Sequence, residues 1–181
     1  MKMEHDAIIK KAQSVVRPKF WLDYQHGIHG IPHWTRVWYH GRRIVITLDV
    51  NPAILAWFAF LHDCQRRNDH QDPLHGRRAA DFAVMLRRDS PIVKLSSTEF
   101  EQLSEAMRLH SDGLIEGEAS IRAGWDADRL DLSLVGIEHE ISRLCTPYAR
   151  IRKTVAEASR MAVGQRRIMT GWLVDWLNGL R

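Results

Sequence analysis

The chain has 181 residues, of which 26 are Lys or Arg and 22 are Asp or Glu, so its formal net charge is +4. Hydrophobic residues make up 45 % of it and charged residues 27 %, a balance that excludes disordered and collagen-like proteins. No apolar run approaches the roughly 18 residues of a membrane-spanning helix, and the charged start MKMEHDAIIKKAQ lacks a signal-peptide core. Two cysteines make no disulfide framework. We therefore expect one cytoplasmic domain over residues 1–181.

Glycines and prolines divide the chain into segments with helical periodicity. The predicted helices are residues 3–16, 33–47, 52–64, 76–88, 97–110, 126–145 and 150–180. The β-branched run IVITL has no evident partner strand, so we assign it to the end of the second helix. The predicted fold class is all-α, a single-domain helical bundle.

Two of these helices carry start signals. Asn51 suits the N-cap and Pro52 the first helical position, and residues 52–64 are apolar nearly all round, which predicts a central, buried helix. For residues 97–110, Ser97 or Thr98 together with Glu101 predicts a capping arrangement.

Ten histidines are many for a chain of this length, and they raise the question of a site. The segment HGIHGIPHWTRVWYH holds four of them, His26, His29, His33 and His40. The buried helix ends in His62 and Asp63, and burying both groups is costly unless they are paired or bound to a cation. Such nitrogen and oxygen ligands suit Mn²⁺, Fe²⁺, Zn²⁺ or Co²⁺. On its own, the dipeptide fits a hydrogen-bonded pair at a helix end better than a metal site.

A second polar cluster is the acidic stretch WDADRLDL, with Asp126, Asp128 and Asp131 around Arg129. Acidic residues are favoured in a first helical turn, so a solvated helix start explains it. Its apolar neighbours predict partial burial, which again requires a partner for each buried carboxylate.

The order of these pieces resembles the HD superfamily of metal-dependent phosphohydrolases: an upstream His, a His-Asp doublet and a distant Asp. The motifs are GIHGIPHWTRV, FLHDCQRRNDHQDPLHGRRAA and WDADRLDL, within a core of about residues 27–140. The chain is similar to an uncharacterised bacterial branch of that superfamily. The resemblance implies a helical bundle with one or two divalent ions, Mn, Fe, Zn, Co or Ni, in its core.

The resemblance also implies the site residues. The metal ligands would be His33, His62, Asp63 and Asp128, with Asp126 as the competitor of Asp128 because the ADRL context favours the latter. His75 and His110 match positions used for a second metal or for substrate phosphate. His29 would be a loop neighbour of the site.

The expected reaction is hydrolysis of a phosphomonoester or small nucleotide by a metal-bound hydroxide. The candidates for binding the phosphate are Arg66, Arg77 and Arg78, since cationic donors should surround the growing negative charge. Related enzymes carry a Glu shortly after the doublet, where this chain has Arg66 and Arg67. Beside Asp63, the catalytic candidate is therefore Asp69, with Asp72 as the alternative for orienting or deprotonating the water, or no extra base is needed.

Two rival functions stay open. One is a diiron oxygenase of the HD fold, and the other is a non-catalytic, metal-containing binding domain. We expect neither membrane nor nucleic-acid binding, because no motif for either is present. In residues 150–181, the apolar side chains Trp172, Leu173, Trp176 and Leu177 share one helical face. That face either packs on the domain's own core or forms a homo-oligomer interface.

Overall fold

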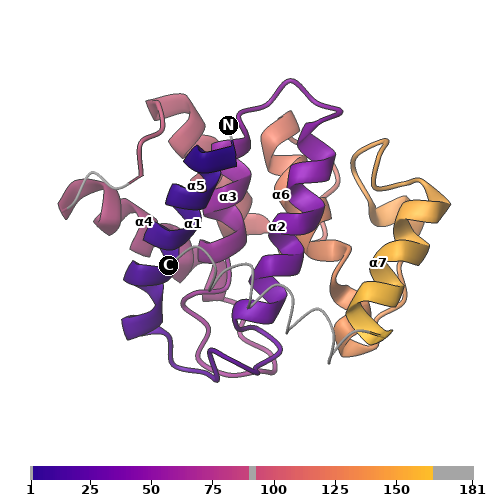
Figure 1. Cartoon of the computed structure of the whole chain (residues 1–181), viewed down its shortest axis with the longest axis horizontal. Helices are drawn as coiled ribbons and strands as arrows, with labels where there is room; N and C mark the ends of the chain where they lie inside the picture. The colour runs from indigo at the N-terminus through magenta and orange to yellow at the C-terminus, as the bar shows by residue number, and fades with distance from the viewer. Residues whose placement is uncertain (1, 90–92, 165–181) are drawn as a thin grey trace.

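The computed structural model describes residues 2–89 and 93–164 of the chain, and over these residues it is all-helical. The elements are α1 (Lys2–Val16), η1 (Arg17–Lys19), α2 (Ile31–Val45), α3 (Pro52–Leu61), α4 (His75–Asp89), α5 (Ser97–Leu109), α6 (Ala119–Arg129), η2 (Leu132–Val135), η3 (Ile141–Arg143) and α7 (Arg152–Gly164), where η marks a 3-10 helix. The predicted fold class, an all-α bundle, is confirmed (Figure 1). None of the described helices is both long and apolar enough to cross a membrane.

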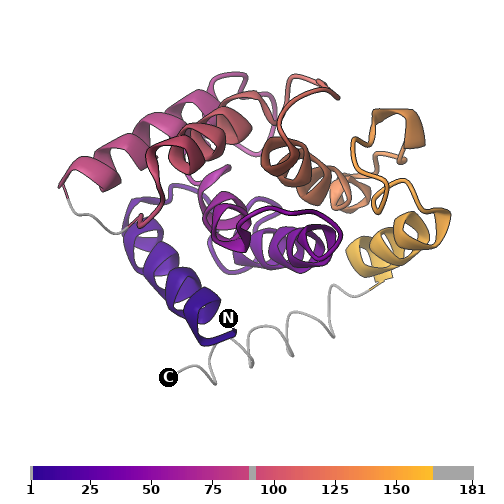
Figure 2. The ribbon, with the colours of Figure 1, turned by 90° about the horizontal axis from the view of Figure 1, so that it is seen from above.

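Helix α3 is the centre of the bundle and contacts α1, α2, α4, α5 and α6, which surround it (Figure 2). Every residue from Ala53 to Leu61 is buried, so this helix must be apolar on all sides. It begins as predicted: the Asn51 side chain accepts a hydrogen bond from the backbone N–H of Ala53, and Pro52 opens the helix.

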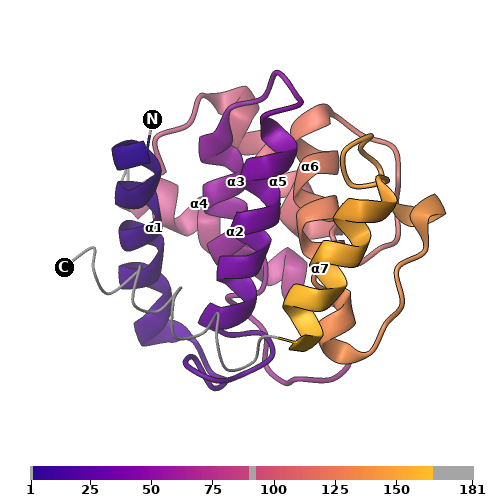
Figure 3. The same ribbon diagram turned by 45° about the vertical axis from the view of Figure 1, so that its right-hand side comes forward.

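Helix α7 lies on the outer side of α2, opposite α1 (Figure 3). Glu157 on α7 accepts hydrogen bonds from Tyr39 and Arg43 on α2, at 2.9 Å each, and α7 also packs on η2. The predicted apolar face of Trp172, Leu173, Trp176 and Leu177 lies outside the described residues.

Three local predictions are wrong. The helix expected over residues 126–145 lies instead at Ala119–Arg129, followed by short 3-10 turns. The acidic cluster is therefore at the end of a helix rather than at its start. Gly124 lies inside α6 because the Phe58 ring is 3.3 Å from where its Cβ would be, which favours glycine despite its poor helix propensity.

The third correction concerns the start of α5. The N-cap is Ser96, which accepts a hydrogen bond from the backbone N–H of Glu99, while the Glu99 carboxylate accepts one from the backbone N–H of Ser96. This is the predicted type of capping box. The residues differ from the expected ones: Ser96 takes the place of Ser97 or Thr98, and Glu99 takes the place of Glu101.

Candidate metal centre

Five helices deliver histidine and aspartate side chains to one buried cluster. His33 lies in the first turn of α2, His62 caps the end of α3, and Asp63 follows it. His75 opens α4 and His110 caps the end of α5. Asp128 lies in the last turn of α6. The helix boundaries thus place at one cluster all six residues that the resemblance implied for a metal site.

The first part of the cluster is the pair His33 and His62, whose Nε2 atoms are 3.1 Å apart. Asp128 Oδ1 lies 3.4 Å from Nε2 of His33 and 3.5 Å from Nε2 of His62. Asp63 Oδ2 is 3.7 and 3.8 Å from the same two nitrogens. Four side chains therefore surround one small space with two nitrogens and two carboxylate oxygens.

The second part is the pair His75 and His110, whose Nε2 atoms are 2.7 Å apart. The other carboxylate oxygen of Asp63, Oδ1, lies 3.1 Å from Nε2 of His75 and 3.5 Å from Nε2 of His110. Asp63 is therefore shared: its Oδ2 faces the first pair and its Oδ1 faces the second.

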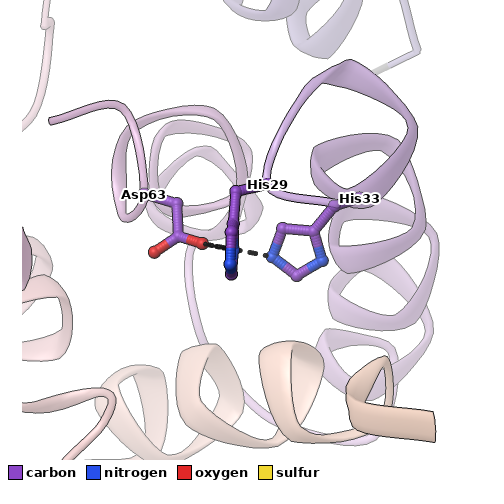
Figure 4. Close-up of side chains that lie close together, drawn as sticks. All are labelled: His29, His33 and Asp63. Carbon is purple, nitrogen blue, oxygen red and sulfur yellow. Dashed lines mark hydrogen bonds and ion pairs between the residues drawn. The ribbon is translucent and has the colours of Figure 1, made fainter. Parts of the chain in front are cut away.

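His29 completes the surroundings of Asp63, with its Nδ1 2.8 Å from Asp63 Oδ2. Figure 4 shows the Asp63 carboxylate directed at the rings of His29 and His33. His29 comes from the loop before α2, as the sequence led us to expect. These three residues, like the set of His33, His62 and Asp128 and the set of His62, Asp63 and His110, are close enough to hold one ion.

The hydrogen bonds of the histidines show why a cation fits here. Nδ1 of His62 lies 3.0 Å from the carbonyl oxygen of Phe58, and Nδ1 of His33 lies 2.7 Å from Asp131 Oδ2. Both oxygens only accept, so each Nδ1 carries the hydrogen and each neutral Nε2 offers a lone pair. Two lone pairs at 3.1 Å repel unless a proton or a metal ion shares them.

The second pair has the same arrangement. Nδ1 of His75 lies 2.5 Å from the carbonyl oxygen of Asp72, and Nδ1 of His110 lies 2.7 Å from that of Met107. Their Nε2 lone pairs again converge, with Asp63 Oδ1 beside them. Second hydrogen bonds of this kind are typical of metal-bound histidines, since they fix the tautomer and the ring orientation.

The pKa values of the cluster reflect the same electrostatics. Burial alone would raise the pKa of Asp63, but the neighbouring His62, His110 and His29 hold it well below its usual range. Burial would likewise lower the pKa of His33, but its hydrogen bonds to Asp128 and Asp131 outweigh that effect and raise it to about 10. Without a metal ion, a proton therefore stays on His33 at neutral pH.

The structure separates the two competing aspartates of WDADRLDL. Asp126 is fully buried, and its carboxylate accepts hydrogen bonds from the backbone N–H groups of Cys145 and Thr146 at 2.6–3.0 Å. These hydrogen bonds hold the end of α6 against the segment that contains Cys145 and Thr146. Asp128 points instead to His33 and His62, which agrees with its predicted position.

Asp131 is a site residue whose role the sequence analysis missed. It is buried and holds Nδ1 of His33, and it also accepts hydrogen bonds from Nε and Nη2 of Arg36 at 2.6 and 3.0 Å. The available signal was spacing: Arg36 follows His33 by three residues, and Asp131 follows Asp128 by three, so both pairs share a helix face or turn.

A cavity of about 410 Å³ opens onto the cluster, and His29, His33, Asp63, His110 and Asp128 line it. His62 and His75 lie behind these residues and are 0 % and 2 % exposed. The cavity thus gives a small molecule access to one side of the cluster.

Of the predicted phosphate-binding arginines, only Arg66 lines this cavity; its Nε is 3.1 Å from Asp63 Oδ1. Arg78 instead binds Asp72 and the carbonyl oxygen of Gln65. Arg77 is exposed near the start of α4, and neither it nor the exposed Asp69 is among the described residues that line the cavity.

Comparison with known proteins supports the fold and leaves the family open. No family model matches the sequence, and no curated protein matches it. A crystal structure of a Lactobacillus plantarum protein from structural genomics is similar, with a TM-score of 0.58 at 15 % identity, covering 94 % of this chain and 97 % of that one. At this identity the likeness shows the fold alone. The His and Asp cluster is compatible with a metal site of the HD type, and membership of that superfamily stays a prediction.

Proposed function

We propose that this chain is a metal-dependent phosphohydrolase of the HD type that binds two divalent ions and hydrolyses a phosphomonoester. The supporting observation is the position of Asp63 between two histidine pairs, on the wall of an accessible cavity. Within the cluster, the Nε2 atoms of each buried histidine pair converge beside a carboxylate oxygen of Asp63. Such a donor set suits Mn²⁺ or Fe²⁺, and Zn²⁺, Co²⁺ and Ni²⁺ also bind it.

In this proposal, His33, His62, Asp63 and Asp128 would hold one ion, and His75, His110 and Asp63 would hold the other. A bound divalent ion lowers the pKa of its water towards neutrality and polarises a phosphoryl oxygen.

The remaining chemistry belongs to side chains around the ligands. His29 hydrogen-bonds to Asp63 Oδ2 and so fixes the orientation of the shared carboxylate. Arg66 holds its guanidinium on the cavity wall by bonds to Asp63 and to the carbonyl oxygen of His70. From there it would donate hydrogen bonds to a phosphate and stabilise charge that develops on its oxygens.

The test compares Mn²⁺-loaded wild type with Asp63→Ala, using p-nitrophenyl phosphate and a panel of phosphomonoesters and nucleotides. Asp81→Asn is the control, since Asp81 is exposed on α4 and outside the described lining of the metal cavity. We expect wild type and Asp81→Asn to hydrolyse at least one ester with equal kcat/KM, and Asp63→Ala to fall to background. Equal activity in Asp63→Ala, or none in the wild type, would overturn the proposal.

A diiron oxygenase is the second candidate, because the same shared carboxylate between two histidine pairs would hold two irons. The discriminating measurement loads the protein with Fe²⁺ and follows O₂ uptake and the Mössbauer spectrum. A coupled diiron centre that takes up O₂, in a protein without phosphatase activity, would replace the hydrolase proposal by the oxygenase.

A further inference from the structure

The cavity beside the metal cluster has two chemically different ends. One end carries the histidines and aspartates described above. Six of the remaining lining residues are aliphatic and form what we call the aliphatic wall: Ile28, Leu132, Leu134, Val135, Ile137 and Leu144. Polar side chains also line this part of the cavity, among them Arg129, Glu138, His139, Glu140 and Arg143. Val135 and Ile137 are 45 % and 51 % exposed, on either side of Gly136, whose φ of 81° turns the chain after η2.

Single exposed aliphatic side chains are ordinary on a protein surface. Val135 and Ile137 differ because they line the same cavity as Leu144, which is buried. The proposed ligands Asp63 and Asp128 line that cavity too. The wall is therefore suited to remove a ligand's apolar part from water while its polar end lies at the metal cluster.

The charges of the cavity limit the negative charge that the polar end of the ligand can carry. Five carboxylates and three arginines line the cavity, and Arg36 neutralises one of the carboxylates, Asp131, so two divalent ions would leave a net charge of about +3. This charge balances a phosphomonoester, whose charge is roughly −1.5 to −2 near neutral pH. A longer polyphosphate would bring more negative charge than the cavity balances.

All three lining arginines already have acceptors within the protein. Arg66 binds Asp63, and Arg129 donates to the carbonyl oxygens of Leu114 and Arg143. Arg143 in turn forms an ion pair with Glu140 at 3.0 Å. Additional phosphate groups would have to compete with these bonds.

Recognition of a nucleobase needs a flat stacking surface, for which aromatic side chains are the usual choice. Among the described residues that line the cavity, no Phe, Tyr or Trp is present. The lining ring outside the metal cluster is His139, and its two nitrogens are already bonded to Ser133 Oγ and to the carbonyl oxygen of Leu130. Branched aliphatic side chains suit an alkyl chain instead.

We infer that the cavity binds a small aliphatic phosphomonoester, with the phosphate at the metal cluster and the alkyl part against the wall that ends in Val135 and Ile137. This inference rests on the proposed function, which supplies the phosphate as the polar end of the ligand. It narrows that function, because nucleotides are then poor substrates.

The test measures binding without requiring catalysis. Methyl-, butyl- and hexylphosphonate resist phosphatase hydrolysis, and their affinities for the Mn²⁺-loaded full chain are compared by calorimetry with that of AMP. Affinity should rise about two- to fourfold for each added methylene group, since each buried methylene contributes on that order. AMP should bind more weakly than hexylphosphonate.

A matched pair of variants locates the effect. Val135→Asn should reduce the ratio of hexyl- to methylphosphonate affinity several-fold. Val84→Asn should leave the ratio unchanged, because Val84 on α4 is equally exposed (48 %) but is not among the described lining residues. The ratio is measured within each variant, so a general change in stability does not affect it.

The outcomes separate this inference from the proposed function. An affinity independent of chain length, tighter binding of AMP, or no binding of any phosphonate would overturn the aliphatic site. Hydrolysis of p-nitrophenyl phosphate alongside any of these results would leave the hydrolase intact. A chain-length gain that Val135→Asn removes, in a protein without phosphatase activity, would support the aliphatic site and overturn the hydrolase.

Discussion

At the scale of single residues, the metal centre depends on how side chains behind the ligands orient them. Asp131 is the main example, since it accepts a hydrogen bond from His33 while paired with Arg36 in a buried network. Groups that orient a ligand without touching the metal are often worth a large part of its affinity. Asp131 also neutralises Arg36, so both the metal centre and the local fold depend on this one carboxylate.

Changing Asp131 to Asn should therefore weaken metal binding more than it alters the fold. We expect the Kd for Mn²⁺ to rise about 10- to 100-fold, because the His33 ring loses a charged acceptor. Competition with a fluorescent chelator measures this Kd. Glu157→Gln is the control, as it removes a carboxylate from Arg43, another α2 arginine, at a half-exposed position. An Asp131→Asn protein with wild-type affinity would contradict the role.

His40 predicts how stability depends on pH. It is buried, and burial is the main reason that its pKa is lowered from 6.5 to about 4, with Arg36 adding to the effect and Asp131 opposing it. The unfolded chain binds this proton below pH 6.5, whereas the folded chain does not. The contribution to stability is thus complete above pH 6.5 and is lost as the pH falls towards 4, by about 3 kcal/mol in total.

The measurement is urea unfolding at pH 7 and pH 5. His40→Gln should lose less free energy of unfolding between these two pH values than the wild type. The exposed His26→Gln should behave as the wild type does. Equal pH dependence in all three proteins would show that His40 titrates normally.

The two aspartates of WDADRLDL also show what sequence reasoning can achieve at this scale. The ADRL context that the resemblance to the HD superfamily implies favoured Asp128 as the ligand. The role of Asp126 depends on the backbone N–H groups of Cys145 and Thr146, which return to α6 through an irregular segment. No periodicity indicates such a return, so the separate roles of these two carboxylates required the structure.

At the scale of elements, close helix contacts place the ligands. Gly76 in the first turn of α4 lies against α5: a Cβ there would collide with the carbonyl oxygen of Met107 and lie 3.1 Å from Nδ1 of His110. The second histidine pair can therefore form only because this position carries no side chain.

Gly76→Ala should push α4 away from α5 and separate His75 from His110. We expect a lower melting temperature and loss of one bound ion per chain, measured by thermal unfolding and by elemental analysis. Gly41→Ala is the control within α2, where the nearest atoms to a new Cβ lie at 3.5 Å, an ordinary contact. That variant should keep its metal content and be unchanged or slightly more stable, since Ala is the better helix former. A Gly76→Ala protein with full metal content would refute this account of the contact.

Elements with strong local signals were the predictable ones. Helix α3 carries an N-cap, an N-terminal proline and an apolar run, and its predicted start at Pro52 is correct. Helix α6 was misplaced because glycines are poor helix formers, so Gly124 favours a break in the helix, whereas tertiary packing against Phe58 favours a glycine there. Helix α5 shows a smaller error of a different origin, because several neighbouring residues could cap it.

At the scale of the whole molecule, the bundle brings the ends of α3 and α5, the starts of α2 and α4, and the last turn of α6 to one cluster. Helix α3 lies at the centre of the bundle (Figure 2). Side chains from the surrounding helices therefore come close to His62 and Asp63 at its end. The resemblance to the HD superfamily implied which histidines and aspartates gather in the cluster, whereas the part played by Asp131 behind His33 required the structure.

The substrate side of the cavity was not predictable in this way. Its aliphatic wall comes from the short turns η2 and η3 and their neighbours, where a long helix was expected. The positive net charge also proved a poor guide, since Arg77 and Arg78 do not line the cavity and its three arginines are already bonded. Local sequence carries little information about such long-range returns of the chain.

The central claim is that Asp63 lies between two metal-binding histidine pairs, and the metal content of the purified chain tests it most directly. After equilibration with Mn²⁺ and removal of free metal, mass spectrometry should find two ions per wild-type chain. The double variant His75→Gln/His110→Gln, which keeps the pair of His33 and His62, should retain one. Equal metal content in the two proteins, or none in the wild type, would contradict the claim.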